Sequence, residues 1–323
     1  MHGSELEKRA VAARLPTSAR LQIVSPCPTP PRGPHWLHEI KHDGHRLTAI
    51  ISEGGSLRLL SRRGLDRTAL FRTPFRKLAS AARTMVLDGE IAIPDDRGVT
   101  HLDALTDALA GKQAERPAYF AFDLLYLDGH DLRRCPIEHR KAALRQVLDD
   151  HPCERVIYVD HVIGRGDELF AHVRAIGAEG IVSKRMGQPY RGGESRDWLK
   201  TKCSEIGRFV VTGFQELGEG RLEAIHVAEE RDDGLHPVGQ VRFGFAGKGL
   251  RSVLDALREG RVKGSVVTVP PVLSAEAKFF GGHQAGSIRD GVILALAERR
   301  TVAHARLWCC DCDDALAAYD VHD

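Results

Sequence analysis

Alternating apolar and polar positions predict strands through much of the chain, separated by stretches with helical spacing. Residues 85–94 alternate, with Asp88 and Glu90 on the face opposite the apolar side chains. Residues 118–127 form a nearly continuous apolar run, which is typical of a buried strand. Shorter strands are expected at residues 36–41, 47–51, 56–61, 156–162, 179–185 and 198–202, and helices at residues 73–83, 102–110, 137–148 and 166–177.

The pattern changes beyond about residue 205. Short strands are expected there at residues 209–214, 222–229, 238–245 and 265–269, with one helix at residues 250–258. This set fits a barrel of the OB type. We therefore predict an α+β chain with a flexible leader at residues 1–20, a domain of antiparallel sheets and helices at 21–204, an OB-fold β-barrel at 205–303 and an acidic tail at 304–323.

Length and composition agree with two globular domains in a reducing compartment. The chain has 323 residues, of which 42% are hydrophobic and 28% charged. No apolar run approaches the roughly 20 residues that span a membrane, and the leader lacks the apolar segment of a secretory signal. The seven cysteines are odd in number and mostly scattered. We expect a cytoplasmic protein without a membrane partner.

The charge is unevenly distributed. Net charge is only +2, but residues 309–323 contain five aspartates and no Lys or Arg, so the rest of the chain carries +7. A basic body modestly favours a nucleic-acid partner. In the same tail Cys309 and Cys312 have C-x-x-C spacing, yet no second pair supplies the other two ligands of a zinc site. We expect a mobile tail instead.

The first stretch that suggests chemistry is E-I-K-H-D-G-H-R at residues 39–46, where Lys41 ends a predicted strand and Gly44 allows a tight turn. A lysine is a nucleophile only as the neutral amine. At an unperturbed pKa near ~10.4, about one molecule in a thousand is neutral at physiological pH. Neighbouring cations or burial must lower that pKa. Taken alone, the string is more typical of a surface lysine in a polar turn.

Several predicted strands direct charged residues to one face. These charged residues are Glu39, Lys41, Asp88, Glu90, Glu179, Lys200 and Lys202, and Arg46 and Arg62 lie near them in the sequence. Nucleotidyl transfer needs such a set, because cations neutralise charge on phosphate oxygens and carboxylates hold Mg²⁺. The chain has no G-x-x-x-x-G-K-[ST] sequence, so ATP is not expected to bind in the manner of a P-loop.

These residues fall in segments that resemble the motifs of the covalent nucleotidyltransferases, in the same order along the chain. The six segments are K-H-D-G-H-R at 41–46, S-R-R-G at 61–64, L-D-G-E at 87–90, residues 120–123, E-G-I-V at 179–182 and K-T-K at 200–202. The E-I-K and W-L-K-T-K strings are most similar to ATP-dependent DNA ligases, and residues 238–245 to the ligase module of bacterial ligase D. The resemblance covers roughly residues 20–300.

The resemblance implies an adenylation domain followed by an OB-fold, and a role for each site residue. Lys41 would form the lysyl-AMP. Glu39 would contact adenine, and Phe122 would stack on it. Lys200 and Lys202 would hold the α-phosphate. Phe122 also lies in an apolar run, so a place in the core is the alternative for this residue.

Four further residues complete the implied site. Arg46, Arg62 and Glu90 would hold the ribose side, and Glu90 and Glu179 would bind Mg²⁺ or Mn²⁺. Glu179 could instead cap the entrance of a strand, and Asp88 could satisfy a turn. ATP is favoured over NAD⁺ because no domain for a nicotinamide half precedes the first motif.

The implied function is sealing of 5′-phosphate/3′-hydroxyl breaks in DNA repair or end joining, through a lysyl-AMP and a DNA-adenylate. The expected partners are nicked or broken double-stranded DNA and a DNA-end-binding repair protein, with the enzyme acting as a monomer at the bacterial nucleoid. An RNA ligase or an mRNA-capping-type guanylyltransferase shares the motifs and is the alternative. An inactive DNA-binding scaffold is a third possibility, although the intact charged residues argue against it.

Two positions depart from the ligase pattern. Glu194 stands where such ligases carry a basic residue, six positions before Lys200, so either Arg191 or Arg196 replaces that contact or one nucleotide contact is missing. The C-terminal motif that meets pyrophosphate is reduced to R-D-G at residues 289–291. This reduction bears on the efficiency of lysine adenylylation, not on the class of reaction.

Overall fold

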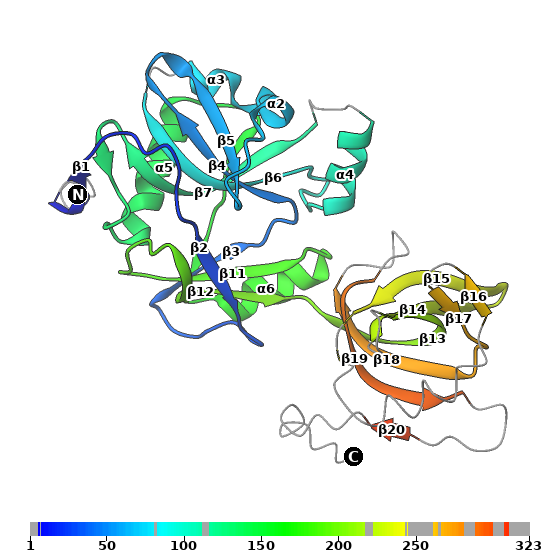
Figure 1. Ribbon diagram of the computed structural model, residues 1–323. Helices are drawn as coiled ribbons and strands as arrows, with labels where there is room; N and C mark the ends of the chain where they lie inside the picture. Colours follow the sequence, from blue (N-terminus) through cyan, green and yellow to red (C-terminus); the bar gives the residue numbers. More distant parts are fainter. Residues whose placement is uncertain are drawn as a thin grey trace. The chain divides into compact units, whose positions relative to one another are not determined.

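The computed structural model describes residues 6, 8–80, 83–111, 116–216, 222–242, 244, 261–263, 266–280, 288–299 and 307–309. The chain divides into two compact units, Met1–Cys203 and Ser204–Asp323 (Figure 1). Among the described residues, no helix is long and apolar enough to cross a membrane.

The first unit contains two sheets. Its larger sheet has the strand order β1-β8-β7-β6-β4-β5, with β9 added beside β7. These strands are β1 (Val11–Ala12), β4 (His45–Ile51), β5 (Leu57–Ser61), β6 (Met85–Ala92), β7 (Ala118–Leu127), β8 (His130–Asp131) and β9 (Val156–Tyr158). The helical segments of this part are η1 (Glu53–Gly55), α2 (Thr68–Phe71), η2 (Thr73–Phe75), α3 (Arg76–Ala79), α4 (Leu102–Ala110) and α5 (Ile137–Asp150). Apolar side chains of the strands and helices, such as Leu87, Phe75 and Leu144, share one core.

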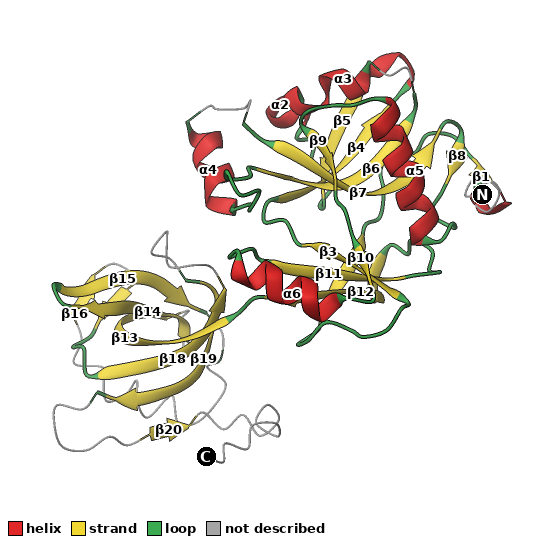
Figure 2. Cartoon of the chain, turned by 180° about the vertical axis from the view of Figure 1, so that it is seen from behind, coloured by secondary structure: helices red, strands yellow, loops and turns green. Residues whose placement is uncertain are grey.

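The smaller sheet of the first unit has the order β10-β3-β11-β12-β2. Its strands are β2 (Gln22–Pro26), β3 (Trp36–Ile40), β10 (Val162–Ile163), β11 (Gly180–Arg185) and β12 (Gly193–Lys202). Helix α6 (Gly166–Ala175) covers one face, where Val173 packs with Ile181 (Figure 2). A separate cluster, which includes Leu37 and Trp198 from this sheet and Val86 from the larger one, joins the two sheets.

The second unit is built from strands in the part that the structure describes. The order is β15-β14-β13-β18-β19-β20, and β17 joins β16 to β13. The strands are β13 (Glu205–Glu216), β14 (Leu222–Arg231), β15 (Gly234–Val241), β16 (Arg261–Lys263), β17 (Val266–Thr268), β18 (Leu273–Phe280), β19 (Arg289–Glu298) and β20 (Leu307–Cys309). Phe209, Ile225 and Phe279 are buried in its core. The helix predicted at residues 250–258 and residues 310–323 of the tail lie outside the described residues.

Some predicted elements are wrong in detail. The helix expected at residues 73–83 is replaced at residues 73–79 by the short segments η2 and α3, and α3 ends where the Ser80 N–H and hydroxyl both donate to the Lys77 carbonyl. The strand expected at 156–162 is split between β9 and β10, which belong to different sheets. In the leader, Val11–Ala12 pairs with β8.

Candidate active site

Three neighbouring strands of the smaller sheet form the floor of a pocket. The register places Val182 of β11 opposite Glu39 of β3 and Lys200 of β12, and places Lys184 opposite Trp198. Alternate side chains of a strand point to the same face. The side chains on the pocket face are therefore Glu39, Lys41, Val182, Lys184, Trp198, Lys200 and Lys202, and all of them line the pocket.

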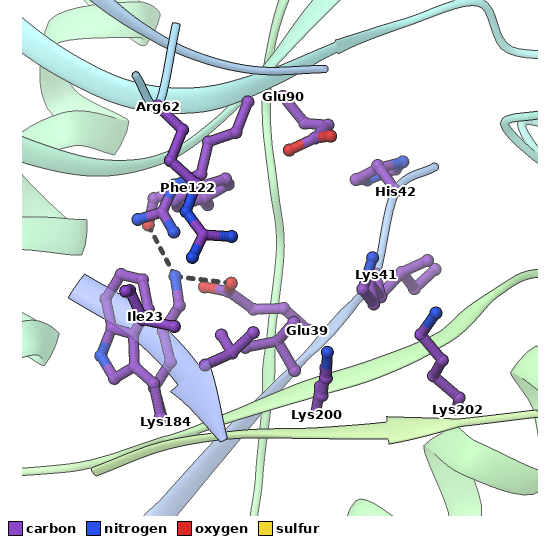
Figure 3. Close-up of a pocket in the computed structure, with 15 residues that line it drawn as sticks. Ile23, Glu39, Lys41, His42, Arg62, Glu90, Phe122, Lys184, Lys200 and Lys202 are labelled. Carbon is purple, nitrogen blue, oxygen red and sulfur yellow. Dashed lines mark hydrogen bonds and ion pairs between the residues drawn. The ribbon is translucent and has the colours of Figure 1, made fainter. Parts of the chain in front are cut away.

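Side chains from the larger sheet face this floor and enclose a cavity of about 250 Å³ (Figure 3). Arg46 comes from β4, Arg62 from the turn after β5, Glu90 from β6 and Phe122 from β7. The structure thus brings together all eight residues that the sequence assigns to nucleotide binding: Glu39, Lys41, Arg46, Arg62, Glu90, Phe122, Lys200 and Lys202. Phe122 is half-buried and lines the cavity, so it is not a residue of the core alone.

Lys41 lies directly after β3, in a loop that packs tightly against the larger sheet. Its N–H donates to the Gly180 carbonyl at 2.9 Å. A Cβ at Gly44 would lie 2.1 Å from the Ile91 carbonyl oxygen, so only glycine allows this close approach. The Asp43 carboxylate accepts a hydrogen bond from the N–H of Leu102 (3.1 Å), the first residue of α4. These contacts fix the backbone that carries Lys41.

Glu179 immediately precedes β11 and is not among the described residues that line the pocket, but it holds two of the lysines that do. Its carboxylate is only 4% exposed and pairs with Lys41 and, at 3.1 Å, with Lys202. The alternative role predicted for Glu179, a cap at the start of a strand, does not account for these two ion pairs. Because one buried carboxylate joins both lysines, the side chains of Lys41 and Lys202 are held close together.

Arg46 is held by a buried network on the roof of the pocket. Its guanidinium makes two hydrogen bonds to the Asp88 carboxylate, at 2.9 and 2.6 Å, and one to the Gln22 carbonyl at 2.7 Å. The Tyr190 hydroxyl also donates to Asp88, at 2.7 Å. The interpretation of Asp88 as a turn residue is therefore wrong, since Asp88 lies within β6 and positions Arg46. Arg46 also lies 5.4 Å from the Phe122 ring centroid.

Glu39 has two buried partners that sequence reasoning missed. Its carboxylate lies 2.5 Å from Nζ of Lys141, which comes from α5, and 2.7 Å from Nζ of Lys184. The period of two along β11 is a signal that could have identified Lys184, because it shares a face with Val182. Lys141 gives no such signal, since its contact with Glu39 depends on how α5 packs.

Of the two carboxylates predicted to bind a metal ion, Glu90 lines the pocket, and Glu179 is linked to it through Lys41 and Lys202. Burial raises the pKa of Glu90 to about 8, against the lowering effect of Lys41 and Arg46, and the charge of Glu179 adds to the rise. A bound cation would favour the ionised form of Glu90. In the described part of the chain, no three His, Cys, Asp or Glu side chains are grouped to hold a metal ion. Mg²⁺ commonly uses one or two carboxylates with substrate phosphates and water, so two carboxylates suffice.

His42 follows Lys41 and packs its ring on Phe120. The two ring centroids lie 3.9 Å apart and the planes are 21° from parallel. Its Nδ1 is buried without a hydrogen-bond partner. Burial lowers the pKa of His42 from 6.5 to about 4, with a smaller raising effect from Glu39 and a lowering one from Lys41. The imidazole is therefore neutral at physiological pH.

This neutral histidine predicts an acid-dependent loss of stability. Between pH 6.5 and about 4, the unfolded chain binds a proton at His42 that the folded chain does not bind, so stability falls as pH decreases through this range. His42→Phe keeps a stacking ring and removes the titration. We expect the difference in melting temperature, variant minus wild type, to rise as pH falls from 7 to 4.5. A difference that is constant with pH would contradict this assignment.

The structure describes both segments that depart from the ligase pattern. Glu194 is exposed, and Arg191 pairs with Asp197 at 3.4 Å. Neither Arg191 nor Arg196 is among the described residues that line the pocket. Residues 289–291 begin β19.

Comparison with known proteins decides the family. A model of the ATP dependent DNA ligase domain matches residues 27–202, more than half of the chain. The chain belongs to the ATP-dependent DNA ligase family. All six motif segments lie within or at the ends of the matched range. The resemblance drawn from the sequence is thereby confirmed, including its likeness to ligase D.

Individual relatives agree with this assignment. The multifunctional non-homologous end joining protein LigD of Pseudomonas aeruginosa is 32% identical over 300 residues, which are 86% of this chain and 35% of that protein. The chain spans about a third of the length of the LigD proteins that it matches. A DNA ligase of Natronomonas pharaonis is 31% identical over 277 residues, 79% of this chain and 49% of that protein.

A solved structure extends the agreement to the fold. The ligase domain of LigD from M. tuberculosis is 26% identical, with a TM-score of 0.51, over 84% of this chain and 92% of that chain. The predicted α+β class, with an adenylation domain followed by an OB-fold, is therefore confirmed.

Proposed function

We propose that this protein seals breaks between a 5′-phosphate and a 3′-hydroxyl in double-stranded DNA, with Lys41 as the nucleophile toward ATP. The single observation that carries the proposal is the pocket, in which eight residues from distant motifs meet around Lys41. Membership of the DNA ligase family supports the choice of DNA over an RNA ligase or a capping-type guanylyltransferase.

The first step forms the protein adduct. The neutral amine of Lys41, having lost one proton, attacks the α-phosphorus of ATP. A phosphorus–nitrogen bond forms, the bond from that phosphorus to the bridging oxygen of the β-phosphate breaks, and pyrophosphate leaves. Lys200 and Lys202 line the same end of the pocket, where their charges offset the charge that develops on the α-phosphate oxygens.

Two transfers to DNA follow. A 5′-phosphate oxygen of the break attacks the phosphorus of the lysyl-AMP, and the amine of Lys41 leaves. The 3′-hydroxyl then attacks the 5′-phosphorus of the DNA-adenylate, loses its proton, and expels AMP. The phosphodiester bond is complete at this point and Lys41 is free again.

The remaining pocket residues bind and orient the nucleotide. Phe122 offers a flat face for stacking with the purine ring, and Glu39 accepts a hydrogen bond from the adenine amine. Arg46, Arg62 and Glu90, on the roof, would hold the ribose side. When Mg²⁺ or Mn²⁺ is bound, Glu90 and Glu179 would hold it, and it would neutralise phosphate charge.

The biological setting is part of the same proposal. The names of the LigD relatives refer to non-homologous end joining, which favours a role in end joining or repair at the bacterial nucleoid, with a DNA-end-binding repair protein as partner. Without residues 309–323 the chain carries +7, which suits contacts with phosphates that do not read sequence. We propose that it acts as a monomer.

The test compares sealing by three forms of the protein on a labelled nicked duplex with ATP and Mg²⁺. The full chain is expected to seal. A fragment of residues 1–203, the first compact unit, keeps the pocket and should bind ATP but seal poorly, because the second unit is proposed to hold the duplex. Deleting only residues 309–323 is the matched control and should leave sealing intact or raise DNA affinity, since five negative charges are removed.

Failure of the full chain to seal nicked DNA, with sealing of nicked RNA instead, would replace the proposed substrate. Equal sealing by the fragment and the full chain would exclude the proposed role of the second unit. Loss of sealing when only the tail is deleted would point to a structural role for that tail.

A further inference from the structure

Tyr190 is a buried residue beside the pocket that the proposed reaction does not use. It lies between β11 and β12, is 6% exposed, and is not among the described residues that line the pocket. Its backbone N–H donates to the Arg133 carbonyl at 2.7 Å, and its ring belongs to the cluster that joins the two sheets. The hydroxyl of Tyr190 is therefore held at a fixed place between the sheets.

The hydroxyl of Tyr190 is fully engaged by its neighbours. It donates to Asp88 Oδ2 at 2.7 Å and accepts from the Gln22 N–H at 3.0 Å, and Nη2 of Arg46 lies 3.4 Å away. A hydroxyl has one donor and two acceptor sites, so these contacts use all of them. Burial raises the pKa of Tyr190 well above its usual range, and the charge of Asp88 adds to the rise, so the hydroxyl keeps the proton that it donates.

Tyr190 closes a ring of hydrogen bonds around Arg46. The guanidinium donates to Asp88 Oδ2 at 2.6 Å and to the Gln22 carbonyl at 2.7 Å, while Tyr190 joins Asp88 to the Gln22 N–H. Asp88 and Gln22 are 0% exposed, so water cannot replace a lost partner. Removing the Tyr190 hydroxyl would leave the Gln22 N–H unpaired and take one donor from Asp88.

The ring fixes the plane of the Arg46 guanidinium. Three of its five N–H groups donate to Asp88 or Gln22. The same guanidinium lies 5.7 Å from the ring centroid of Trp198, and both residues line the pocket. Tyr190 packs edge-on against Trp198, with ring centroids 5.5 Å apart. The orientation of Arg46 in the pocket is thus set by groups that lie outside it.

We propose that Tyr190 is a positioning residue for the reaction: through Asp88 and Gln22 it holds the Arg46 guanidinium in the orientation that binds the ribose side of ATP. The inference rests on the proposed function, in which Arg46 makes that contact. Because the contact is present before and during the reaction, its loss should raise KM for ATP and leave the maximal rate nearly unchanged.

The experiment follows formation of the protein adduct by the full chain at several concentrations of labelled ATP with Mg²⁺. Tyr190→Phe removes one oxygen atom and keeps the packing of the ring. It is expected to raise the ATP concentration at half-maximal rate roughly 3- to 30-fold, the scale of one hydrogen bond. The maximal rate at saturating ATP should stay close to that of wild type.

Tyr126→Phe is the matched control. Tyr126 is 4% exposed and belongs to the same cluster, but its hydroxyl donates to the Ala13 carbonyl at 3.1 Å and not to the ring around Arg46. This variant should require the same ATP concentration as wild type. A loss of ATP affinity in both variants would show that any buried hydroxyl of the cluster matters, which would contradict a specific role for Tyr190.

A double-mutant cycle separates positioning from a general structural role. Arg46→Lys keeps a cation beside Asp88 but has no planar fork to orient. Arg46→Lys alone should raise the half-saturating ATP concentration, and adding Tyr190→Phe should change it further by no more than about twofold, because both substitutions act on one contact. Equal effects of Tyr190→Phe in the two backgrounds would contradict the proposal.

Gln22→Met tests the same link if Tyr190→Phe does not fold. The Gln22 side-chain oxygen accepts from the N–H of Arg191, the residue after Tyr190, at 2.8 Å. Loss of this contact should raise the half-saturating ATP concentration by a smaller factor than loss of the hydroxyl.

Unchanged ATP dependence in Tyr190→Phe would overturn the inference, and so would unchanged dependence in Gln22→Met where Tyr190→Phe does not fold. Failure of wild type to form any adduct with ATP would instead refute the proposed function itself, and this inference with it.

Discussion

Lys41→Ala is expected to abolish the covalent AMP adduct. Wild type incubated with labelled ATP and Mg²⁺ should carry label through a denaturing gel, in a bond that is stable to base and labile to acid. The physical reason is that the phosphorus–nitrogen bond needs an amine at the α-phosphate. Among the lysines that line the pocket, Lys41 lies in the loop that several backbone contacts fix against both sheets.

The matched control is Lys77→Ala, which removes an exposed lysine from α3. It should label as wild type does, and both variants should melt near the wild-type temperature. Label in Lys41→Ala would show that another residue is the nucleophile. Label from GTP alone in wild type would favour the capping-type alternative.

Glu179→Ala is expected to reduce nick sealing by about 100-fold or more, the scale seen when one preorganised electrostatic contact is removed from an active site. Its carboxylate holds Lys41 and Lys202 together from a position only 4% exposed. Without it, the two ammonium groups repel each other, and the proposed cation loses one of two ligands. Sealing rates at saturating ATP, with melting temperatures to exclude unfolding, provide the measurement.

Glu168→Ala is a suitable comparison, because Glu168 forms an exposed ion pair with Arg165 at the start of α6. It should seal within about twofold of wild type, since exposed pairs contribute little. Near-normal sealing by Glu179→Ala at ordinary Mg²⁺ would exclude Glu179 both as an anchor for Lys41 and as a metal ligand. Glu179→Gln, which keeps the shape but not the charge, should resemble the alanine variant.

The strand faces that carry the charged residues could be predicted from the sequence because strand periodicity is a local property. Lys200 and Lys202 occupy alternate positions of one strand, and so do Asp88 and Glu90 of another, so the faces of their strands could be assigned before any pairing was known. Motif resemblance then linked these strands to Lys41 and Arg62. The structure places five of these side chains around one cavity, and their roles are part of the proposed function: Lys41, Arg62, Glu90, Lys200 and Lys202.

The features of the site that could not be predicted from the sequence depend on contacts between residues far apart in the chain. Lys141 reaches Glu39 from α5, a helix that packs on β7 and β9, and Asp88 positions Arg46 only because β4 and β6 are neighbours in register. Local spacing carries no information on either contact. The helix expected at 73–83 failed for a different reason, since the Ser80 N–H donates to the Lys77 carbonyl and ends α3, and apolar spacing does not report where a helix stops.

The most direct test of the account is a transfer experiment with the isolated protein adduct. Protein labelled with AMP is freed of ATP and mixed with a nicked duplex that carries a 5′-phosphate. We predict that the label moves from Lys41 to the 5′-phosphate and is then released as AMP while the nick is sealed. Label that stays on the protein, or that moves only to an RNA end, would contradict the assignment of Lys41 as the nucleophile of a DNA ligase.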